Sequence, residues 1–565
     1  MLGKKNQLWF IKFKPLFAVI VALGASVSTS LWGQTHSERV TIFSSFQPSL
    51  QEFSKINIKP EPPSTYFETL DTEFPSVEKV MSTSAELELI SPLLARTKDN
   101  QNEYRNYVKA SLGSFISPFF FFMHHSNLSK ETSLDLSIQH LSSWIKVKDY
   151  APSDWMQNAF SLGLNHAFSN HSLRSDLYYK YNSNRYYGFK PDDFPENDFI
   201  KSDLAQRYQN IGFSTSLKSN YKDVNMLHHE VNLKYNYLTD HFSAREHSFN
   251  LKGDLQKNFE WFRYDGNQTT GIEINTGYYA NNDTVIKNTD FLLGLMPTLR
   301  LAGSFYEIKA GLRLNYFNDS SAHFYAYPVL SGKLFIFDQR VEMYALMDGD
   351  LNRQSLYQMT DNNPFLRSGE AAYWSNTRFL FKTGIKTGII KNLDLHFGLQ
   401  FNEIDNAGFY ITDTTTPFQN TLKVVNDNVN LLTFVGELSY KLSNKFMIAS
   451  KLQFDKYETT TLTRVWHTPS FQMNLRANYQ FDEKLRFLSE MIFQSHRYAP
   501  YYIGGIEKIM DLKPVADINI GSEYAINEQF TVFAQINNLL HNKYERYYNY
   551  PVQGIQLFAG MSLKF

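Results

Sequence analysis

The chain has 565 residues, no cysteine, and 55 basic against 56 acidic side chains. The lack of cysteine excludes disulfide frameworks, thiolate metal sites and cysteine nucleophiles, and the even charge balance gives no indication of nucleic-acid binding. Its 35 tyrosines and 47 phenylalanines are typical of interfaces and of the aromatic girdles of membrane proteins.

The first 33 residues predict an export signal. Four lysines precede residue 15, and the apolar run at 15–28 is too short to cross a bilayer as a helix. We expect cleavage after Gly33, with cleavage after Ser30 as the alternative and an uncleaved membrane anchor as a further one. Beyond this signal the longest strongly apolar run is 119–123, so residence in a membrane requires a closed barrel of strands.

The rest of the chain divides into two parts of different character. Residues 34–103 are rich in proline and acidic side chains and show no sustained period, which predicts an extended or loosely folded segment. From Tyr104 onward apolar and polar positions alternate, as in strands that face lipid on one side and a water-filled lumen on the other. The clearest examples are 108–113, 133–139, 515–524 and 530–537. We therefore predict an all-β fold in which 104–565 forms a transmembrane antiparallel β-barrel.

Short polar turns divide the barrel region at regular intervals. They lie at 128–131, 169–172, 218–223, 256–259, 302–305, 337–340, 390–393, 442–445, 481–484 and 526–529. Longer aromatic and charged stretches lie between them, for example at 184–198, 348–367, 495–510 and 541–554. Short periplasmic turns and eleven long extracellular loops then give about 22 strands, with roughly 18–24 as the accepted range. We interpret 408–427 as an extension of the two neighbouring strands.

The last strand predicts how the barrel closes. One face is apolar and the other mostly polar, and an unpaired strand edge in lipid costs several kcal/mol per backbone group, so this strand must pair with the first. The terminal aromatic residue also resembles the signal that outer-membrane proteins present for assembly. A secreted β-sandwich is the alternative. The apolar face of this C-terminal assembly strand comprises Ile555, Leu557, Ala559, Met561, Leu563 and Phe565.

The last forty residues resemble the C-terminal end of TonB-dependent receptors. In that family a V-N-N-L-(F/L) strand is followed by K-Y, an aromatic loop with a proline, and a terminal strand. The matching positions are Ile536, Asn537, Asn538, Leu539, Leu540, Lys543, Tyr544, Pro551 and Phe565. The resemblance implies a 22-stranded barrel in the outer membrane of a Gram-negative cell, and the composition is similar to that of proteins of the Bacteroidota.

The N-terminal side departs from that family. Its members carry a folded plug of well over a hundred residues, whereas only about 70 residues lie between Gln34 and Glu103 here. We expect residues 34–103 to be a reduced plug that enters the lumen from the periplasm, because a lumen of this width must be filled by something. The segment at 39–48 is a candidate TonB-binding strand, but a simple lead-in to the barrel is the favoured interpretation, so TonB remains an open partner.

Motifs for catalysis are not found. No G-x-S-x-G, H-E-x-x-H or phosphate-binding glycine loop occurs, and we predict no enzyme activity, no cofactor and no metal. On a strand, His228 and Glu230 face one way and His229 the other, so a bystander pair is favoured over a metal site. The acids of 190–198 could hold calcium, but a solvated loop is favoured.

Two long loops near the C-terminus carry an unusual density of tyrosine and arginine. Exposed Tyr and Arg suit recognition of sugars or peptides by stacking and hydrogen bonding, and packing between loops is the alternative interpretation. The candidate recognition residues are Arg497, Tyr498, Tyr501, Tyr502, Arg546, Tyr547, Tyr548 and Tyr550.

The sequence thus favours an outer-membrane β-barrel that serves uptake or passage of a solute. The alternative is a non-transporting scaffold barrel in a larger outer-membrane complex, and an adhesin is a weaker third interpretation. The expected partners are outer-membrane lipid and, for either of the first two functions, a surface lipoprotein or another protein of an outer-membrane complex.

Overall fold

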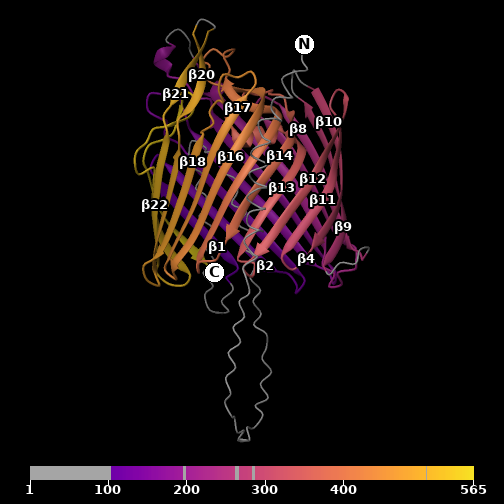
Figure 1. Ribbon diagram of the computed structural model, residues 1–565. Helices are drawn as coiled ribbons and strands as arrows, with labels where there is room; N and C mark the ends of the chain where they lie inside the picture. Colours follow the sequence, from indigo (N-terminus) through magenta and orange to yellow (C-terminus); the bar gives the residue numbers. More distant parts are fainter. Residues whose placement is uncertain (1–103, 195–198, 261–265, 283–286, 504–505) are drawn as a thin grey trace, which may run out of the picture. The chain divides into compact units, whose positions relative to one another are not determined.

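The computed structural model describes residues 104–194, 199–260, 266–282, 287–503 and 506–565. Twenty-two of the strands in these residues form one antiparallel sheet that closes on itself as a barrel (Figure 1). The predicted fold class and strand number are therefore confirmed. Among the described residues, no helix is long and apolar enough to cross a membrane. The predicted signal at 1–33 and the segment 34–103 lie outside the described residues.

The barrel strands follow one another around the ring in sequence order. They are β1 (Asn106–Gly113), β2 (Ser117–Asn127), β3 (Thr132–Ser143), β4 (Trp155–Ala167), β5 (His171–Arg185), β6 (Ala205–Ser219), β7 (His228–Asp240), β8 (Arg245–Asn258), β9 (Asn267–Asn282), β10 (Lys287–Ala302), β11 (Tyr306–Asn318), β12 (Ala322–Ile336), β13 (Val341–Gln354), β14 (Tyr373–Thr387), β15 (Leu393–Thr412), β16 (Leu422–Ser443), β17 (Phe446–Thr459), β18 (Phe471–Gln480), β19 (Leu485–Gln494), β22 (Val515–Ala525), β23 (Phe530–Asn537) and β26 (Gln556–Lys564).

The ring closes between its first and last strands. β1 pairs antiparallel with β26 in a register that joins Tyr107 to Lys564 and Gly113 to Phe558. The backbone N–H of Asn106 donates to the Phe565 carbonyl oxygen at 2.8 Å, and the Phe565 N–H donates back at 3.0 Å. This reciprocal pairing removes the free edges that an open sheet would expose to lipid. The predicted pairing of the terminal strand with the first strand is confirmed.

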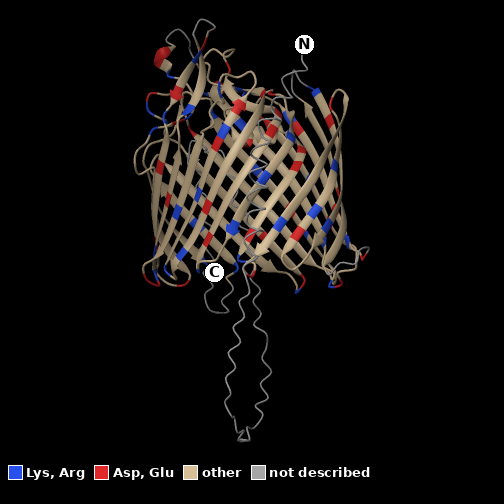
Figure 2. Cartoon of the chain, viewed as in Figure 1, with Lys and Arg blue, Asp and Glu red and all other residues tan. Residues whose placement is uncertain are grey.

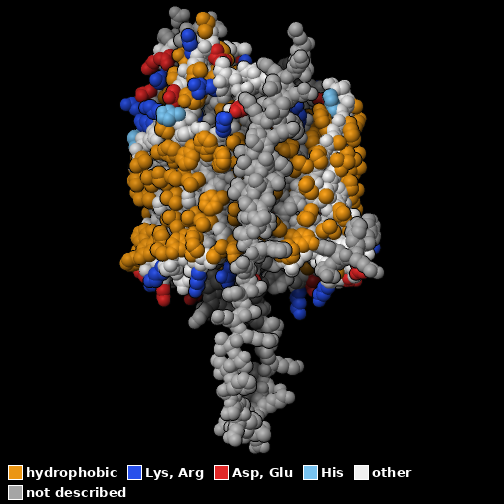
Figure 3. Space-filling model, in the orientation of Figure 1, with side chains coloured by type: hydrophobic (Ala, Val, Ile, Leu, Met, Phe, Trp, Pro, Cys, Tyr) orange, Lys and Arg blue, Asp and Glu red, His pale blue; other side chains and the backbone are white. Residues whose placement is uncertain are grey.

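The two faces of the wall differ as the alternation predicts. On β26, Leu557 and Met561 are each 53% exposed on the outer face, whereas Phe558 on the inner face is 5% exposed. On β11, Ile308 points outward, while Arg313 on the inner face pairs with Asp348 at 3.0 Å. On the face shown in Figure 3 the outer side chains form a broad apolar band, with charged side chains above and below it. Charged residues also recur along the strands themselves (Figure 2).

The two ends of the barrel differ in their connections. Ten connections join consecutive strands at one end, which we call the turn end. Eight of them have two to five residues as predicted, whereas 220–227 and 259–266 have eight. At the other, the loop end, four of the eleven connections are only three or four residues long, at 114–116, 241–244, 283–286 and 319–321, so the prediction of eleven long loops is wrong. Strand pairing there continues to the rim, as in β11 and β12, which pair up to Asn318 and Ala322, and the three residues 319–321 suffice to join them. The interpretation of 408–427 is confirmed, because β15 and β16 extend to Thr412 and from Leu422.

Candidate functional site

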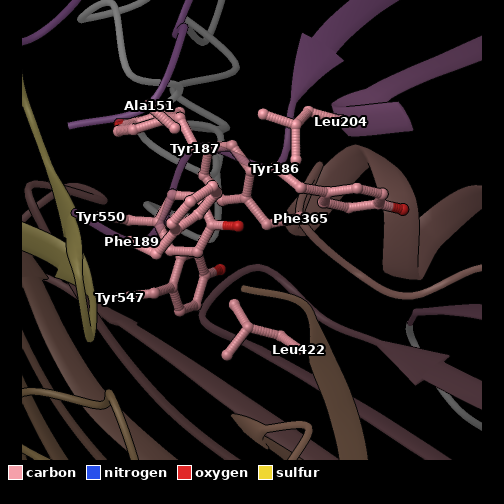
Figure 4. Packing of buried hydrophobic residues seen from close by; sticks show 9 residues of the cluster. All are labelled: Ala151, Tyr186, Tyr187, Phe189, Leu204, Phe365, Leu422, Tyr547 and Tyr550. Atoms are coloured by element: carbon pink, nitrogen blue, oxygen red, sulfur yellow. The ribbon is translucent and has the colours of Figure 1, made fainter. Parts of the chain in front are cut away.

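The long loops of the loop end fold together rather than standing apart. Large aromatic rings from three of them bury one another in a single cluster, which removes apolar surface from water (Figure 4). Partly buried rings from two more loops, Tyr150 and Phe418, pack against it. Its buried members are Ala151, Tyr186, Tyr187, Phe189, Leu204, Phe365, Leu422, Tyr547 and Tyr550. We call the assembly of loops 144–154, 186–204, 355–372, 413–421, 460–470, 495–514 and 538–555 the loop cap.

The centre of the cluster is a close aromatic contact between three loops. The ring of Tyr550 stacks on Phe365 with centroids 3.9 Å apart and meets Tyr187 edge to face at 4.9 Å. The Tyr187 hydroxyl donates to the Pro551 carbonyl oxygen at 2.9 Å. Each buried hydroxyl is thus satisfied by backbone, and the rings fix the relative positions of loops that are more than 170 residues apart in sequence.

The loop cap connects opposite sides of the barrel. Tyr186 directly follows β5 and Leu422 begins β16, and these strands lie eleven positions apart in a ring of 22. The side-chain amide of Asn420 donates to the Tyr186 carbonyl oxygen at 2.7 Å, and the Tyr550 hydroxyl donates to the Asn420 carbonyl oxygen. Loops from diametrically opposite walls therefore meet by direct hydrogen bonds above the lumen.

The loop 355–372 contains the cap's only α-helix among the described residues, α2 (Leu356–Asn362). Ser355 begins it with a capping box, in which its hydroxyl accepts from the Gln358 N–H and the Gln358 side chain accepts from the Ser355 N–H. The first two N–H groups of the helix, of Leu356 and Tyr357, donate to the Glu246 carboxylate on β8 at 2.9 and 3.1 Å. A wall residue thus fixes the helix start, where a negative charge is favoured.

Glu246 belongs to a buried charge cluster on the inner wall. Arg353 on β13 pairs with Asp290 on β10, and its other amino group lies 3.8 Å from Glu246. The guanidinium also lies 4.4 Å from the centroid of the Tyr279 ring. All three charged side chains are at most 3% exposed. Glu246 therefore joins α2 to the wall. Losing any one of the three charges would leave the others buried without full compensation, which is strongly destabilising.

Beyond α2, the same loop pairs with both sides of the mouth. The Leu366 carbonyl oxygen accepts from the hydroxyls of Tyr186 at 2.8 Å and Tyr208 at 3.3 Å. The Leu422 N–H donates to the Phe365 carbonyl oxygen at 2.9 Å, which gives a short parallel bridge to the start of β16. Loop 355–372 therefore links the two sides of the loop cap.

His467 in loop 460–470 joins three segments of the loop cap. Its Nδ1–H donates to the Tyr410 carbonyl oxygen at 2.9 Å, its Nε2 accepts from the Tyr548 N–H at 3.2 Å, and its own N–H donates to the Tyr498 carbonyl oxygen at 2.8 Å. These bonds fix the neutral tautomer with hydrogen on Nδ1. Burial, with a smaller contribution from the Arg497 charge, lowers the pKa of His467 to about 3.

The structure separates the eight predicted loop residues into two groups. Arg497, Arg546, Tyr547 and Tyr550 are buried within the loop cap. Arg497 donates to the carbonyl oxygens of Arg546 at 2.8 Å and Glu545 at 2.6 Å, and burial lowers its pKa to about 10. These four side chains contribute to packing between loops, the interpretation that the sequence had left open beside recognition.

The other four predicted residues, Tyr498, Tyr501, Tyr502 and Tyr548, are half-buried. The rings of Tyr501 and Tyr548 lie 6.1 Å apart, and the Arg464 guanidinium lies 4.3 Å from the centroid of Tyr498. The Tyr502 hydroxyl donates to Glu507 at 3.3 Å. We call these four residues the tyrosine group. Their rings retain accessible surface, which the four buried residues do not.

Several residues of the site carry no distinct signal in the sequence. Glu246, Arg353 and His467 are single polar residues in strands or loops, and only the fold brings them together. The density of aromatic residues in 184–189 and 541–550 is a usable signal, because rings clustered in two loops must either pack or face water. His228 and His229 lie at the start of β7, and no group of three or more metal-ligating side chains occurs in the described parts of the chain.

No protein-family model matches the chain, and no curated protein matches it. Solved structures do. The siderophore receptor PirA from Acinetobacter baumannii is similar with a TM-score of 0.64 and 12% sequence identity, over 83% of this chain and 81% of PirA. The pyoverdine outer membrane receptor FpvA from Pseudomonas aeruginosa gives 0.62 and 11%, over 83% and 79%.

The ferric-catecholate import receptor Fiu from E. coli gives a TM-score of 0.61 and 9% identity, over 82% of each chain. At such identities the likeness is one of fold. The chain is therefore built as the 22-stranded barrel of outer-membrane receptors.

Proposed function

We propose that this protein resides in the outer membrane of a Gram-negative cell, with the turn end in the periplasm, and passes a solute through a gated lumen. The observation that carries this proposal is a polar-walled closed barrel whose mouth is bridged by the loop cap. The similar solved proteins are receptors for siderophores, pyoverdine and ferric catecholates, which supports uptake and gives no reason to propose an enzyme. The resemblance of the last forty residues supports a barrel of the TonB-dependent receptor type, and the composition supports the Bacteroidota type.

The tyrosine group is our candidate for first contact with the solute. Accessible aromatic rings beside an arginine provide stacking surfaces and hydrogen-bond donors, which suit sugars and peptides. The buried residues Arg497 and Tyr547 then transmit binding to the loop cap, since they directly precede Tyr498 and Tyr548 in the chain.

Residues 34–103 are proposed to act as a reduced plug, which enters from the periplasm after removal of a signal at 1–33. The strand β1 starts at the turn end, so the chain that precedes it arrives at that end of the lumen. A plug at the turn end and a loop cap at the loop end would close the lumen twice in series. TonB is a partner of this proposal only if 39–48 binds it.

Conductance in planar bilayers tests these proposals. Four forms are compared: the mature chain, a deletion of 34–90, a replacement of 356–366 by a Gly-Ser linker of equal length, and the two changes combined. Because closures in series each limit the current, we expect a small rise from either change and a large rise from both. A full rise from the loop change alone contradicts the plug. No rise from the combined form contradicts passage through the lumen.

A scaffold barrel is the second candidate, and one observation favours it. The loop cap is held by buried rings, a buried charge cluster and hydrogen bonds between opposite walls, which are features of a permanent closure. If the combined form conducts but no solute ever opens the intact protein, the barrel serves as a scaffold. Recovery of a stoichiometric partner, such as a surface lipoprotein, from native membranes would support that function.

A further inference from the structure

A two-stranded hairpin projects from the loop end and takes no part in the barrel wall (Figure 1). It consists of β20 (Arg497–Ile503) and β21 (Ile506–Leu512), paired antiparallel. Its base is fixed, because Arg497, Ala499 and Leu512 are at most 3% exposed in the loop cap. Its far half is open, with Ile506 63% and Ile509 46% exposed.

The backbone of the hairpin shows which groups face outward. In an antiparallel pair, opposite residues alternate between pairs that bond to each other and pairs whose N–H and C=O point away. The Tyr498 carbonyl oxygen accepts from His467, outside the hairpin, so the pair Tyr498–Asp511 is of the second kind. By the same alternation so are Pro500–Ile509 and Tyr502–Glu507. Proline at 500 agrees, because it has no N–H to offer its partner.

The outer edge of β21 is therefore a row of available hydrogen-bonding groups. The N–H and C=O of Glu507, Ile509 and Asp511 point away from β20, and within the described residues none of them bonds to another segment. Such an edge is a template for a further strand. The side chains of the same three residues share one face of the hairpin with Tyr498, Pro500 and Tyr502.

We propose that the edge of β21 binds an extended segment of another protein, in which basic and apolar side chains alternate along one face, that is, at every second residue. The segment would add as a third strand, with its apolar residue beside Ile509 and a basic residue beside each of Glu507 and Asp511. Cross-strand pairs of opposite charge stabilise a sheet, and like charges opposite each other destabilise it.

A second copy of this chain is a poorer occupant of the edge. Two β21 strands paired antiparallel about Ile509 would place Glu507 of each opposite Asp511 of the other, so two like-charged pairs would face each other. Both carboxylates have polar neighbours. The hydroxyls of Tyr502 and Thr463 donate to Glu507, and His496 Nδ1 lies 2.8 Å from the Asp511 carboxylate.

Binding of two synthetic peptides to the detergent-solubilised mature protein tests the inference. The probes are Thr-Lys-Thr-Val-Thr-Lys-Thr and its acidic counterpart Thr-Glu-Thr-Val-Thr-Glu-Thr, each with a fluorophore. We expect the basic peptide to bind at least about tenfold more tightly at low salt, with the preference falling as salt rises. Equal binding of the two peptides overturns the proposal, as does concentration-dependent dimerisation that the basic peptide cannot displace.

Three variants separate edge pairing from other modes of binding. I509P removes the outward N–H while leaving the bonds within the hairpin, as the natural Pro500 opposite it shows, and it should abolish binding. I509A keeps the backbone and should retain most of it. The double change E507K and D511K should reverse the preference to the acidic peptide. Unchanged binding by I509P, or an unreversed preference, contradicts a third strand at this edge. None of these outcomes depends on whether the barrel conducts.

Discussion

His467 is the residue through which acid is expected to loosen the loop cap. Its pKa is lowered from 6.5 to about 3, chiefly by burial, so above pH 6.5 it is neutral in the folded and unfolded states alike and its stabilising bonds are fully present. Below pH 6.5 only the unfolded form binds the proton. Stability is therefore lost as pH falls towards 3, by about 1.4 kcal/mol for each pH unit.

Hydrogen exchange of the segments 460–470 and 538–555 at pH 7 and pH 4.5 measures this loss. We expect the protection factors, which correct for the slower intrinsic exchange at low pH, to be smaller at pH 4.5 than at pH 7 in the wild type. H467Q, whose side chain does not titrate, should exchange at the same rate at both values once intrinsic rates are corrected. The groups that face His467 are the Tyr410 carbonyl, the Tyr547 ring and the Arg497 charge, none of which titrates in this range. Equal pH dependence in both proteins would show that another group is responsible.

Gly560 lies at the closing seam, where β26 approaches β1 too closely for a larger residue. A Cβ at Gly560 would overlap the Ala110 carbonyl oxygen and Ser111, whereas a Cβ at Gly332 on β12 meets nothing within 4 Å. We expect G560A to weaken the pairing of β1 with β26 and to lower the temperature at which the barrel loses its heat-modifiable mobility in gels. G332A is the matched control and should behave as wild type. Identical mobility transitions in the two variants would contradict a tight seam.

At the level of elements, the anchoring of α2 depends on one wall carboxylate. In E246A two N–H groups of the helix lose their acceptor and Arg353 keeps only Asp290, which costs about 3 kcal/mol by analogy with other broken buried pairs. Limited proteolysis should then cut within 355–372, and cleavage should precede any loss of the barrel. E403A breaks a half-exposed pair with Arg378 and should leave cleavage unchanged. Resistance of E246A to proteases would show that the rings alone hold the loop.

Strands were predictable from the sequence in a way that loops were not. A strand in this barrel has one face in lipid and one in the lumen, as Leu557 and Phe558 show. Apolar and polar residues therefore alternate within the strand itself, and this pattern is visible in a short stretch of sequence. The loop cap depends on contacts such as Asn420 with Tyr186, 234 residues apart, which leave no period. The sequence indicated that Tyr547 and Tyr550 were unusual. Whether they faced water or other loops was decided by residues far along the chain.

The whole molecule is a ring whose height varies around its circumference. β15 and β16 have 20 and 22 residues, whereas β1, β23 and β26 at the closure have 8, 8 and 9. Loop 355–372 runs from β13 and β14 across the mouth to Tyr186 and Tyr208. The mouth is thus stabilised from within, while the strands at the closing seam are short. Closure of the ring was predictable from the apolar last strand, but this asymmetry was not, because strand length at the rim depends on pairing with neighbours.

The low seam predicts a dependence on bilayer thickness. At about 3.3 Å per residue and a tilt near 40°, eight residues cover roughly 20 Å along the membrane normal, less than the apolar band of about 25 Å that is typical of such barrels. The sixteen residues of β10 cover roughly 40 Å by the same estimate. A thicker bilayer must therefore either thin locally at the seam or place the polar ends of β1 and β26 in contact with hydrocarbon. Either adjustment costs a fraction of a kcal/mol per ångström of mismatch.

Hydrogen exchange in vesicles of short-chain and long-chain phosphatidylcholine measures the effect on the seam. Amides of 107–113 and 557–564 should exchange several-fold faster in the thicker bilayer, because mismatch strain lowers the free energy of opening where the wall is shortest. Amides of β10 serve as the internal control and should exchange equally in both lipids, since that strand exceeds either thickness. A uniform change across all strands would point to a general effect of the lipid. An unchanged seam would mean that the bilayer adapts without strain, and the short strands would then not be the weak point of the ring.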